Sequence, residues 1–84
     1  MTKLTEMPNI GATLAQKLQK AGINSPQDLI GAGTKEAFLR LKTMDNGACF
    51  NMLCALEGAI RGIRWHDLDE TVKADLKRFY QAIK

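Results

Sequence analysis

The sequence has few of the residues from which metal and disulfide sites are built. It contains one histidine, His66, and two cysteines, Cys49 and Cys54, with no CxxC pair. The cysteines lie five residues apart in what the pattern predicts to be one helix, which is poor geometry for a disulfide. We therefore expect two buried, reduced thiols, no metal site and no cofactor.

Long apolar runs are also missing. Residues 1–6 lack the apolar core of a signal peptide, and the longest apolar stretch, residues 48–63, is interrupted by Asn51, Glu57 and Arg61. That stretch is too polar to span a membrane. We therefore expect a protein without membrane contact that is located in the cytoplasm.

Length and composition point to a small globular domain. The chain has 84 residues, of which 45% are hydrophobic and 25% are charged. This balance predicts one domain over residues 1–84 and excludes a disordered chain. The net charge of +3 is compatible with an anionic partner such as DNA but favours it only slightly. No nucleophile, base and orienting group occur together at a recognisable spacing, so we expect neither enzymatic activity nor a small-molecule substrate.

The periodicity of the chain predicts an all-α fold of five to six helices. No segment alternates like a β-strand, and the glycines fall between segments of helical periodicity. The segment 47–62 is apolar around most of its circumference, which is typical of a central helix. The other expected helices cover residues 2–7, 12–21 and 34–41, a short segment that begins after Ser25, and a final segment that begins at Asp67 or Asp69. A turn is expected at Asp45-Asn46-Gly47.

The segment Met7-Pro8-Asn9-Ile10-Gly11 predicts a helix-hairpin-helix element. Pro8 ends the preceding helix, Asn9 tolerates a left-handed backbone, and Ile10 can fill the gap between the two helices. Gly11 has no Cβ, so a neighbour or ligand can approach its backbone closely.

The chemistry of this hairpin suits a DNA phosphate. The turn leads into the N-terminus of a helix, where unpaired N–H groups and the helix dipole attract anions. A tight turn that serves only packing fits the same spacing equally well. The predicted DNA-contact residues are Asn9, Ile10, Gly11, Ala12, Thr13, Lys17 and Lys20.

A second, partial copy of the hairpin follows along the chain. A shift of 22 residues places Asn9-Ile10-Gly11 on Gly31-Ala32-Gly33, whereas Leu18 falls on Arg40. This match predicts a weaker second hairpin and a pseudo-two-fold pair. Chance similarity between two glycine-bearing turns is the competing interpretation. The residues of the second hairpin are Gly31, Ala32, Gly33, Thr34 and Lys35.

Several segments resemble a known family. Residues 4–11 resemble the opening of the C-terminal domain of TfoX/Sxy proteins, and Ala21-Gly22-Ile23, Asp28-Leu29 and Gly31-Ala32 are similar to segments that follow it. The most specific stretch is residues 53–63 with Trp65, which resembles the family's LEGA-x-x-G-I signature. The resemblance extends over residues 4–76.

This resemblance implies a domain similar to SAM and helix-hairpin-helix domains that is linked to the regulation of natural competence. Full-length relatives act as transcriptional co-activators, in some bacteria together with the cyclic-AMP receptor protein, and they carry an additional N-terminal domain. The present chain starts with Met1 at the beginning of the domain. We therefore expect either a stand-alone version or a separately expressed fragment.

Two functions remain open from the sequence. The first is a non-catalytic regulatory domain that contacts the DNA backbone without reading its sequence. Ala12, Thr13 and Leu14 weaken it, because strong DNA hairpins place a Lys or Arg at those positions. The alternative is a protein-interaction module that self-associates or docks on a transcription-regulatory protein, which the aromatic pair Phe79-Tyr80 favours.

Overall fold

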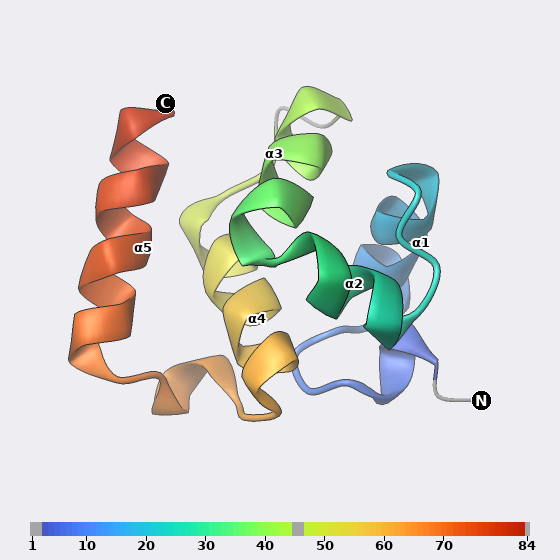
Figure 1. Cartoon of the computed structure of the whole chain (residues 1–84), viewed down its shortest axis with the longest axis horizontal. Coiled ribbons are helices and arrows are strands. Elements are labelled where there is room, and N and C mark those ends of the chain that lie inside the picture. Colours follow the sequence, from blue (N-terminus) through green and yellow to red (C-terminus); the bar gives the residue numbers. More distant parts are fainter. Residues whose placement is uncertain (1–2, 45–46, 84) are drawn as a thin grey trace.

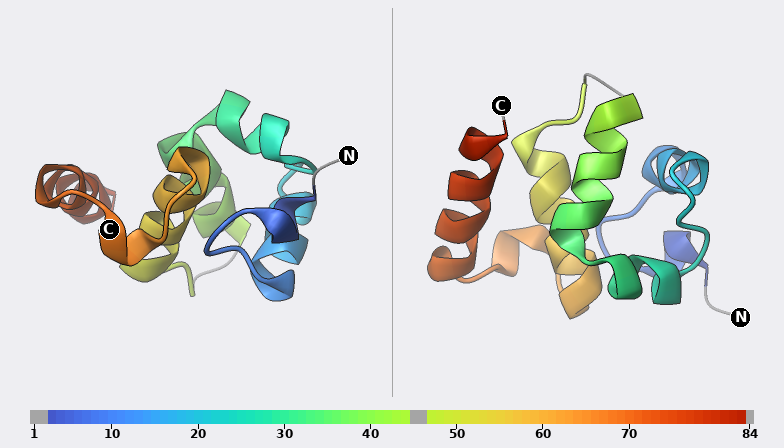
Figure 2. Two further views of the ribbon diagram at one scale, coloured as in Figure 1. Left: turned by 90° about the horizontal axis from the view of Figure 1, so that it is seen from below. Right: turned by 45° about the horizontal axis from the view of Figure 1, so that its top comes forward.

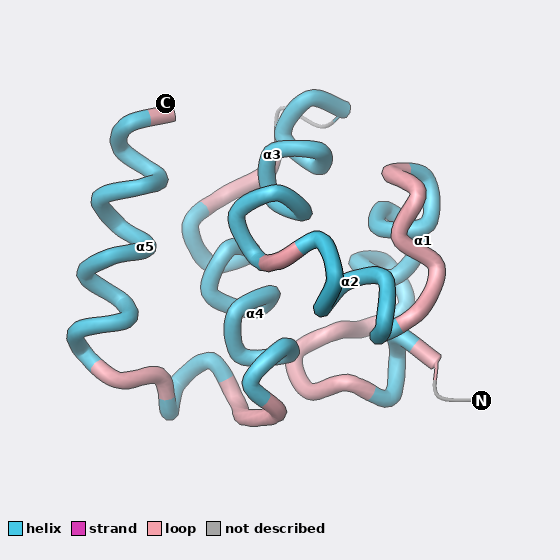
Figure 3. Tube along the Cα trace, viewed as in Figure 1, coloured by secondary structure: helices cyan, strands magenta, loops and turns pink. Residues whose placement is uncertain are grey.

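The computed structural model of the protein describes residues 3–44 and 47–83. Within these ranges the chain forms five α-helices and two 3₁₀ turns, and it contains no strand (Figures 1 and 3), so the expected all-α fold is confirmed. The elements in chain order are η1 (Leu4–Glu6), α1 (Ala12–Lys20), α2 (Pro26–Ala32), α3 (Thr34–Met44), α4 (Phe50–Arg61), η2 (Trp65–Asp67) and α5 (Glu70–Ala82).

Helix α4 is the central helix, as its apolar circumference predicts. It packs against α3, α5, α2 and η2, and it lies between α5 on one side and the N-terminal elements on the other (Figures 1 and 2). Its buried residues are Leu53, Cys54, Ala55, Leu56, Gly58 and Ala59. No helix in the described ranges is both long enough and apolar enough to cross a membrane.

Two helices end at glycines that lie where the sequence predicts the helix ends. After α1, Gly22 has φ 88° and the Ile23 N–H donates to the Leu18 carbonyl at 2.8 Å. After α4, Gly62 has φ 76° and the Ile63 N–H donates to the Gly58 carbonyl at 2.9 Å. Both ends are Schellman motifs, in which a glycine takes the left-handed residue after the helix.

The start of α4 differs from the prediction. The helix begins at Phe50 and not at Gly47, because Cys49 has an extended backbone (φ −123°, ψ 171°) and occupies the N-cap position. The thiol of Cys49 therefore lies outside the helix and is exposed, so the expectation that it is buried is wrong. Cys54 is buried as expected, and burial raises the pKa of its thiol.

The first expected helix, residues 2–7, is a single 3₁₀ turn over Leu4–Glu6. Met7 already has an extended backbone (φ −76°, ψ 145°), as Pro8 requires of the residue before it. Thr2 lies outside the described residues, as do Asp45 and Asn46 of the expected turn. One 3₁₀ turn offers little surface against α1, so the hairpin that follows depends on contacts with other parts of the chain.

Helices α2 and α3 are joined by one residue, Gly33. Its backbone (φ 87°, ψ 161°) lies in a region that is essentially restricted to glycine. The Ala37 N–H donates to the Gly33 carbonyl at 3.0 Å, so α3 begins at Thr34, where the sequence predicts the start of a helix.

Candidate nucleic-acid interface

The side chain of Asn9 holds the hairpin against the C-terminal end of α4. Asn9 has φ 70° and is the only residue other than glycine with a positive φ in the described ranges, which confirms the left-handed prediction. Its amide Nδ2 donates to the Ile63 carbonyl at 2.9 Å and to the Ala55 carbonyl at 3.4 Å. Its Oδ1 accepts the Trp65 N–H at 3.1 Å. These bonds join residues 46 to 56 positions apart.

Gly58 provides the space in which the Asn9 amide lies. A Cβ at Gly58 would be 2.5 Å from Asn9 Nδ2 and 2.8 Å from the Ile63 carbonyl oxygen, which is closer than such atoms can approach. Residues 7–11 and the signature at residues 53–65 therefore form one tertiary unit. We call Asn9, Ala55, Gly58, Ile63 and Trp65 the Asn9 clamp. Figure 1 shows the loop before α1 reaching the lower end of α4.

Gly11 is not required by the fold. Its backbone (φ −92°, ψ −177°) is extended and open to any residue, and a Cβ built on it would meet nothing within 4 Å. Gly11 is the N-cap of α1, where no side chain accepts a helix N–H. Serine, aspartate and asparagine are more stabilising at such a position. Within the described chain no neighbour makes the close approach that Gly11 permits.

The residues directly after Gly11 carry no positive charge, but Arg64 brings one close to the hairpin. It lies between Ile63 and Trp65, both of which bind Asn9 through their backbones. Arg64 is exposed and makes no ion pair with any residue that the structure describes. We call Gly11, Ala12, Thr13 and Arg64, all exposed, the hairpin surface. Sequence reasoning missed Arg64, because only the Asn9 clamp brings it to the hairpin.

The other predicted DNA-contact residues do not belong to this surface. Ile10 is 4% exposed and fills the core, as expected, and the Asn9 side chain points into the clamp. Lys17 and Lys20 lie in the last turn of α1, at the opposite end from Gly11. There they line a hollow of about 210 Å³ together with Leu41 and Met44.

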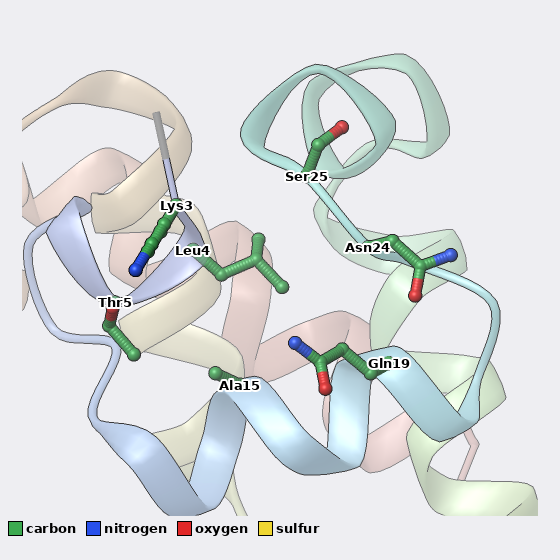
Figure 4. Close-up of a pocket in the computed structure, with 7 residues that line it drawn as sticks. All are labelled: Lys3, Leu4, Thr5, Ala15, Gln19, Asn24 and Ser25. Carbon is green, nitrogen blue, oxygen red and sulfur yellow. The ribbon is translucent and has the colours of Figure 1, made fainter. Parts of the chain in front are cut away.

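A separate hollow of about 430 Å³ lies between η1, α1 and the loop before α2 (Figure 4). In Figure 4 the Gln19 side chain points into it, whereas Asn24 points away. Ser25 is already used as a helix cap, because its Oγ accepts the Asp28 N–H at 3.1 Å. The residues that line this hollow are Lys3, Leu4, Thr5, Ala15, Gln19, Asn24 and Ser25. They bring no acid and base together, so the hollow suggests no chemistry.

The second hairpin is surrounded by carboxylates. Lys35 Nζ lies 3.2 Å from Asp75 of α5 and 5.4 Å from the centre of the Phe79 ring. The hydrogen bond and charge of Lys35 hold the pKa of Asp75 below its ordinary value, and Arg78 adds to this effect. The open hollow beside Gly33, of about 570 Å³, is lined by three acids, which are Glu36, Glu57 and Asp75.

The aromatic pair at the C-terminus is used within the molecule. The Tyr80 ring packs on Phe38 and Phe50, with ring centres 6.1 and 5.8 Å apart. Phe79 is partly buried against the core and lies beneath Lys35. Both rings therefore make contacts within the molecule, and the expectation that Phe79-Tyr80 offers a surface to a partner stays a prediction. In the described residues no cluster of His, Cys, Asp and Glu could hold a metal ion.

Comparison with known proteins identifies close relatives. The model of the TfoX C-terminal domain matches residues 1–80. A crystal structure of an uncharacterized protein from Listeria monocytogenes, in a triclinic form, is 52% identical with a TM-score of 0.96, covering 98% of this chain and 93% of that chain. A tetragonal form of a Listeria monocytogenes protein of unknown function is 52% identical with a TM-score of 0.92, covering 95% of this chain and 99% of that chain. No curated protein matches the sequence significantly.

Proposed function

The chain belongs to the TfoX C-terminal domain family, and we propose that it is a non-catalytic regulatory domain that holds a nucleic-acid backbone at its hairpin surface. The link to competence regulation that the family implies is part of this proposal. The contact would reach phosphates and not base edges, so it would be independent of sequence.

The observation that carries the proposal is Gly11. A glycine at the N-cap of α1 is less stabilising than serine or aspartate, and neither backbone conformation nor packing requires it. An approaching phosphate would require it, because a phosphate bound to the first N–H groups of a helix comes within contact distance of the N-cap residue. A binding role thus accounts for a residue that the fold leaves unexplained.

Arg64 and the Asn9 clamp support the same surface. Arg64 adds a full positive charge between Ile63 and Trp65, the two residues whose backbones bind Asn9. The clamp fixes the loop before α1 through three hydrogen bonds, so little entropy would be lost when a ligand orders it. One helix N-terminus and one arginine imply weak binding, with a dissociation constant of about 10⁻⁴–10⁻⁶ M at physiological salt.

Two substitutions of Gly11 test the proposal. Gly11→Ser and Gly11→Asp both place a capping side chain at α1, so each should raise the free energy of unfolding by a few tenths of a kcal/mol, about 0.3. Both should weaken binding of a labelled DNA duplex in a low-salt fluorescence-anisotropy titration, and Gly11→Asp should weaken it more because its charge repels phosphate. Unchanged affinity in both variants, or no binding by the wild-type protein, would refute the proposal.

The protein-interaction alternative rests on Phe79 and Tyr80, which are only partly exposed because both also make contacts within the molecule. Sedimentation at high concentration separates its self-associating form from the proposal. A dimer whose formation is abolished by Gly11→Asp would reassign the hairpin surface to protein contact.

A further inference from the structure

We propose that the hairpin surface extends over the stacked rings of Trp65 and His66 and that it selects single-stranded nucleic acid, with one unpaired base stacked on His66. This inference rests on the proposed function, since it names the class of nucleic acid that the same surface would hold. The inference adds Trp65 and His66, which are not needed for a phosphate contact at the hairpin.

The first observation is the geometry of the two rings. Their centres are 3.9 Å apart and their planes are inclined by 30°. Trp65 is half-buried and packs against the core, whereas His66 is exposed. The pair therefore forms a small aromatic platform that is fixed from below and open above. Aromatic side chains presented in this way are how proteins bind unpaired bases, since every base has a flat face.

The second observation is where this platform lies. The Trp65 N–H is bound to Asn9 Oδ1, so the platform is held beside the hairpin. Arg64 directly precedes it, and Lys73 Nζ of α5 lies 3.5 Å from the His66 carbonyl oxygen. Cations close to an aromatic platform fit a strand whose phosphates flank a stacked base. In a duplex the bases stack on one another, so none would be available to His66.

Acidic residues limit the affinity of this site. Asp67 follows the platform directly, and Asp69 and Glu70 begin α5. Their charges oppose phosphate, so binding would depend on stacking as well as on charge attraction. Replacing Asp67 by asparagine removes one of these charges, and Asp67→Asn should therefore tighten the binding of single strands.

The single tryptophan of the chain makes the test direct. Trp65 is the only one, so its fluorescence reports on the platform without a label. The wild-type protein is titrated at low salt with oligo-dT, oligo-U and a duplex, each of about 12 nucleotides or base pairs, the usual scale of such sites. Single strands should quench Trp65 and bind roughly tenfold tighter than the duplex. The oligo-dT and oligo-U arms show whether the strand is DNA or RNA.

Variants of His66 distinguish stacking from charge. Their binding is measured by fluorescence anisotropy of a labelled strand, because replacing His66 also changes the emission of the neighbouring Trp65. His66→Ala should reduce the preference for single strands over duplex about fivefold or more, and His66→Phe should restore it. Lys77→Ala on the exposed side of α5 is the control for loss of a positive charge. Equal loss in both His66 variants, or a duplex that binds as tightly as a single strand, overturns this inference and leaves the proposed function standing. If none of the three probes binds, both this inference and the proposed function are overturned.

Discussion

The two glycine-bearing turns resemble each other in sequence and differ in what surrounds them. At the first, the side chain of Asn9 binds the end of α4, the start of α1 is exposed, and Arg64 has no ion pair with a described residue. At the second, the backbone of Gly33 makes the joint, Thr34 is buried, and Lys35 is paired with Asp75.

The difference shows that a cation close to a glycine in sequence is not necessarily a cation available to a ligand. Lys35 lies two residues after Gly33, yet its charge is directed to α5. Arg64 is remote from Gly11 along the chain, yet the Asn9 clamp brings it to the hairpin. Availability thus depends on the carboxylates that tertiary packing places nearby.

The largest expected effect comes from filling the space at Gly58. Gly58→Ala should lower the free energy of unfolding by about 2–4 kcal/mol, because the methyl group displaces the Asn9 amide and breaks its hydrogen bonds. The matched control is Gly31→Ala beside the second turn, where a Cβ meets nothing within 4 Å. That variant should gain about 0.5–1 kcal/mol. Urea denaturation measures both, and equal stability of the two variants would show that the clamp is not needed.

An exchange of residue types between the two turns should destabilise both for opposite reasons. Asn9→Gly keeps a tolerated positive φ but loses three hydrogen bonds, at a cost of about 1–3 kcal/mol. Gly33→Asn places a side chain at φ 87° and ψ 161°, at a cost of about 1–3 kcal/mol. Thermal unfolding of the two variants checks this. If Asn9→Gly left the stability unchanged, the positive φ alone would determine the first turn.

The two cations should differ in their effect on DNA binding. Arg64→Gln should weaken binding severalfold and reduce the slope of log K against log salt by about 0.9. Lys35→Gln should leave the affinity nearly unchanged, because its charge is already paired with Asp75. Anisotropy titrations at several salt concentrations measure both slopes. If Lys35→Gln weakened DNA binding more than Arg64→Gln, the contact would lie at the second turn.

The smallest effect concerns protonation of Asp75. Since Lys35 lowers the pKa of this carboxyl in the folded protein, the carboxylate stabilises the fold above its unfolded pKa, and this contribution is lost as the pH falls through the folded pKa. Lys35→Gln should raise the pKa of Asp75 towards its ordinary value, measured by carboxyl NMR titration. Arg64→Gln is the control and should not move it.

Much of the fold follows from local patterns. The central position of α4 follows from its apolar circumference, and the ends of α1 and α4 follow from Gly22 and Gly62. The start of α4 was misplaced because residues 47–49 continue the apolar pattern of the helix, while the extended backbone at Cys49 leaves no local signal. Of the candidate site, Gly11, Ala12 and Thr13 were found from the turn and the helix that follows it.

What the sequence by itself determined is the order of helices and the turns between them, including the positive φ of Asn9, because these depend on neighbours a few residues apart. The tertiary structure alone decided what Asn9 binds, why residue 58 is a glycine and which cation is paired with Asp75. Those outcomes depend on the packing of α4 against the hairpin and of α5 against α3. Such packing brings together residues 40 or more positions apart, which no local pattern encodes.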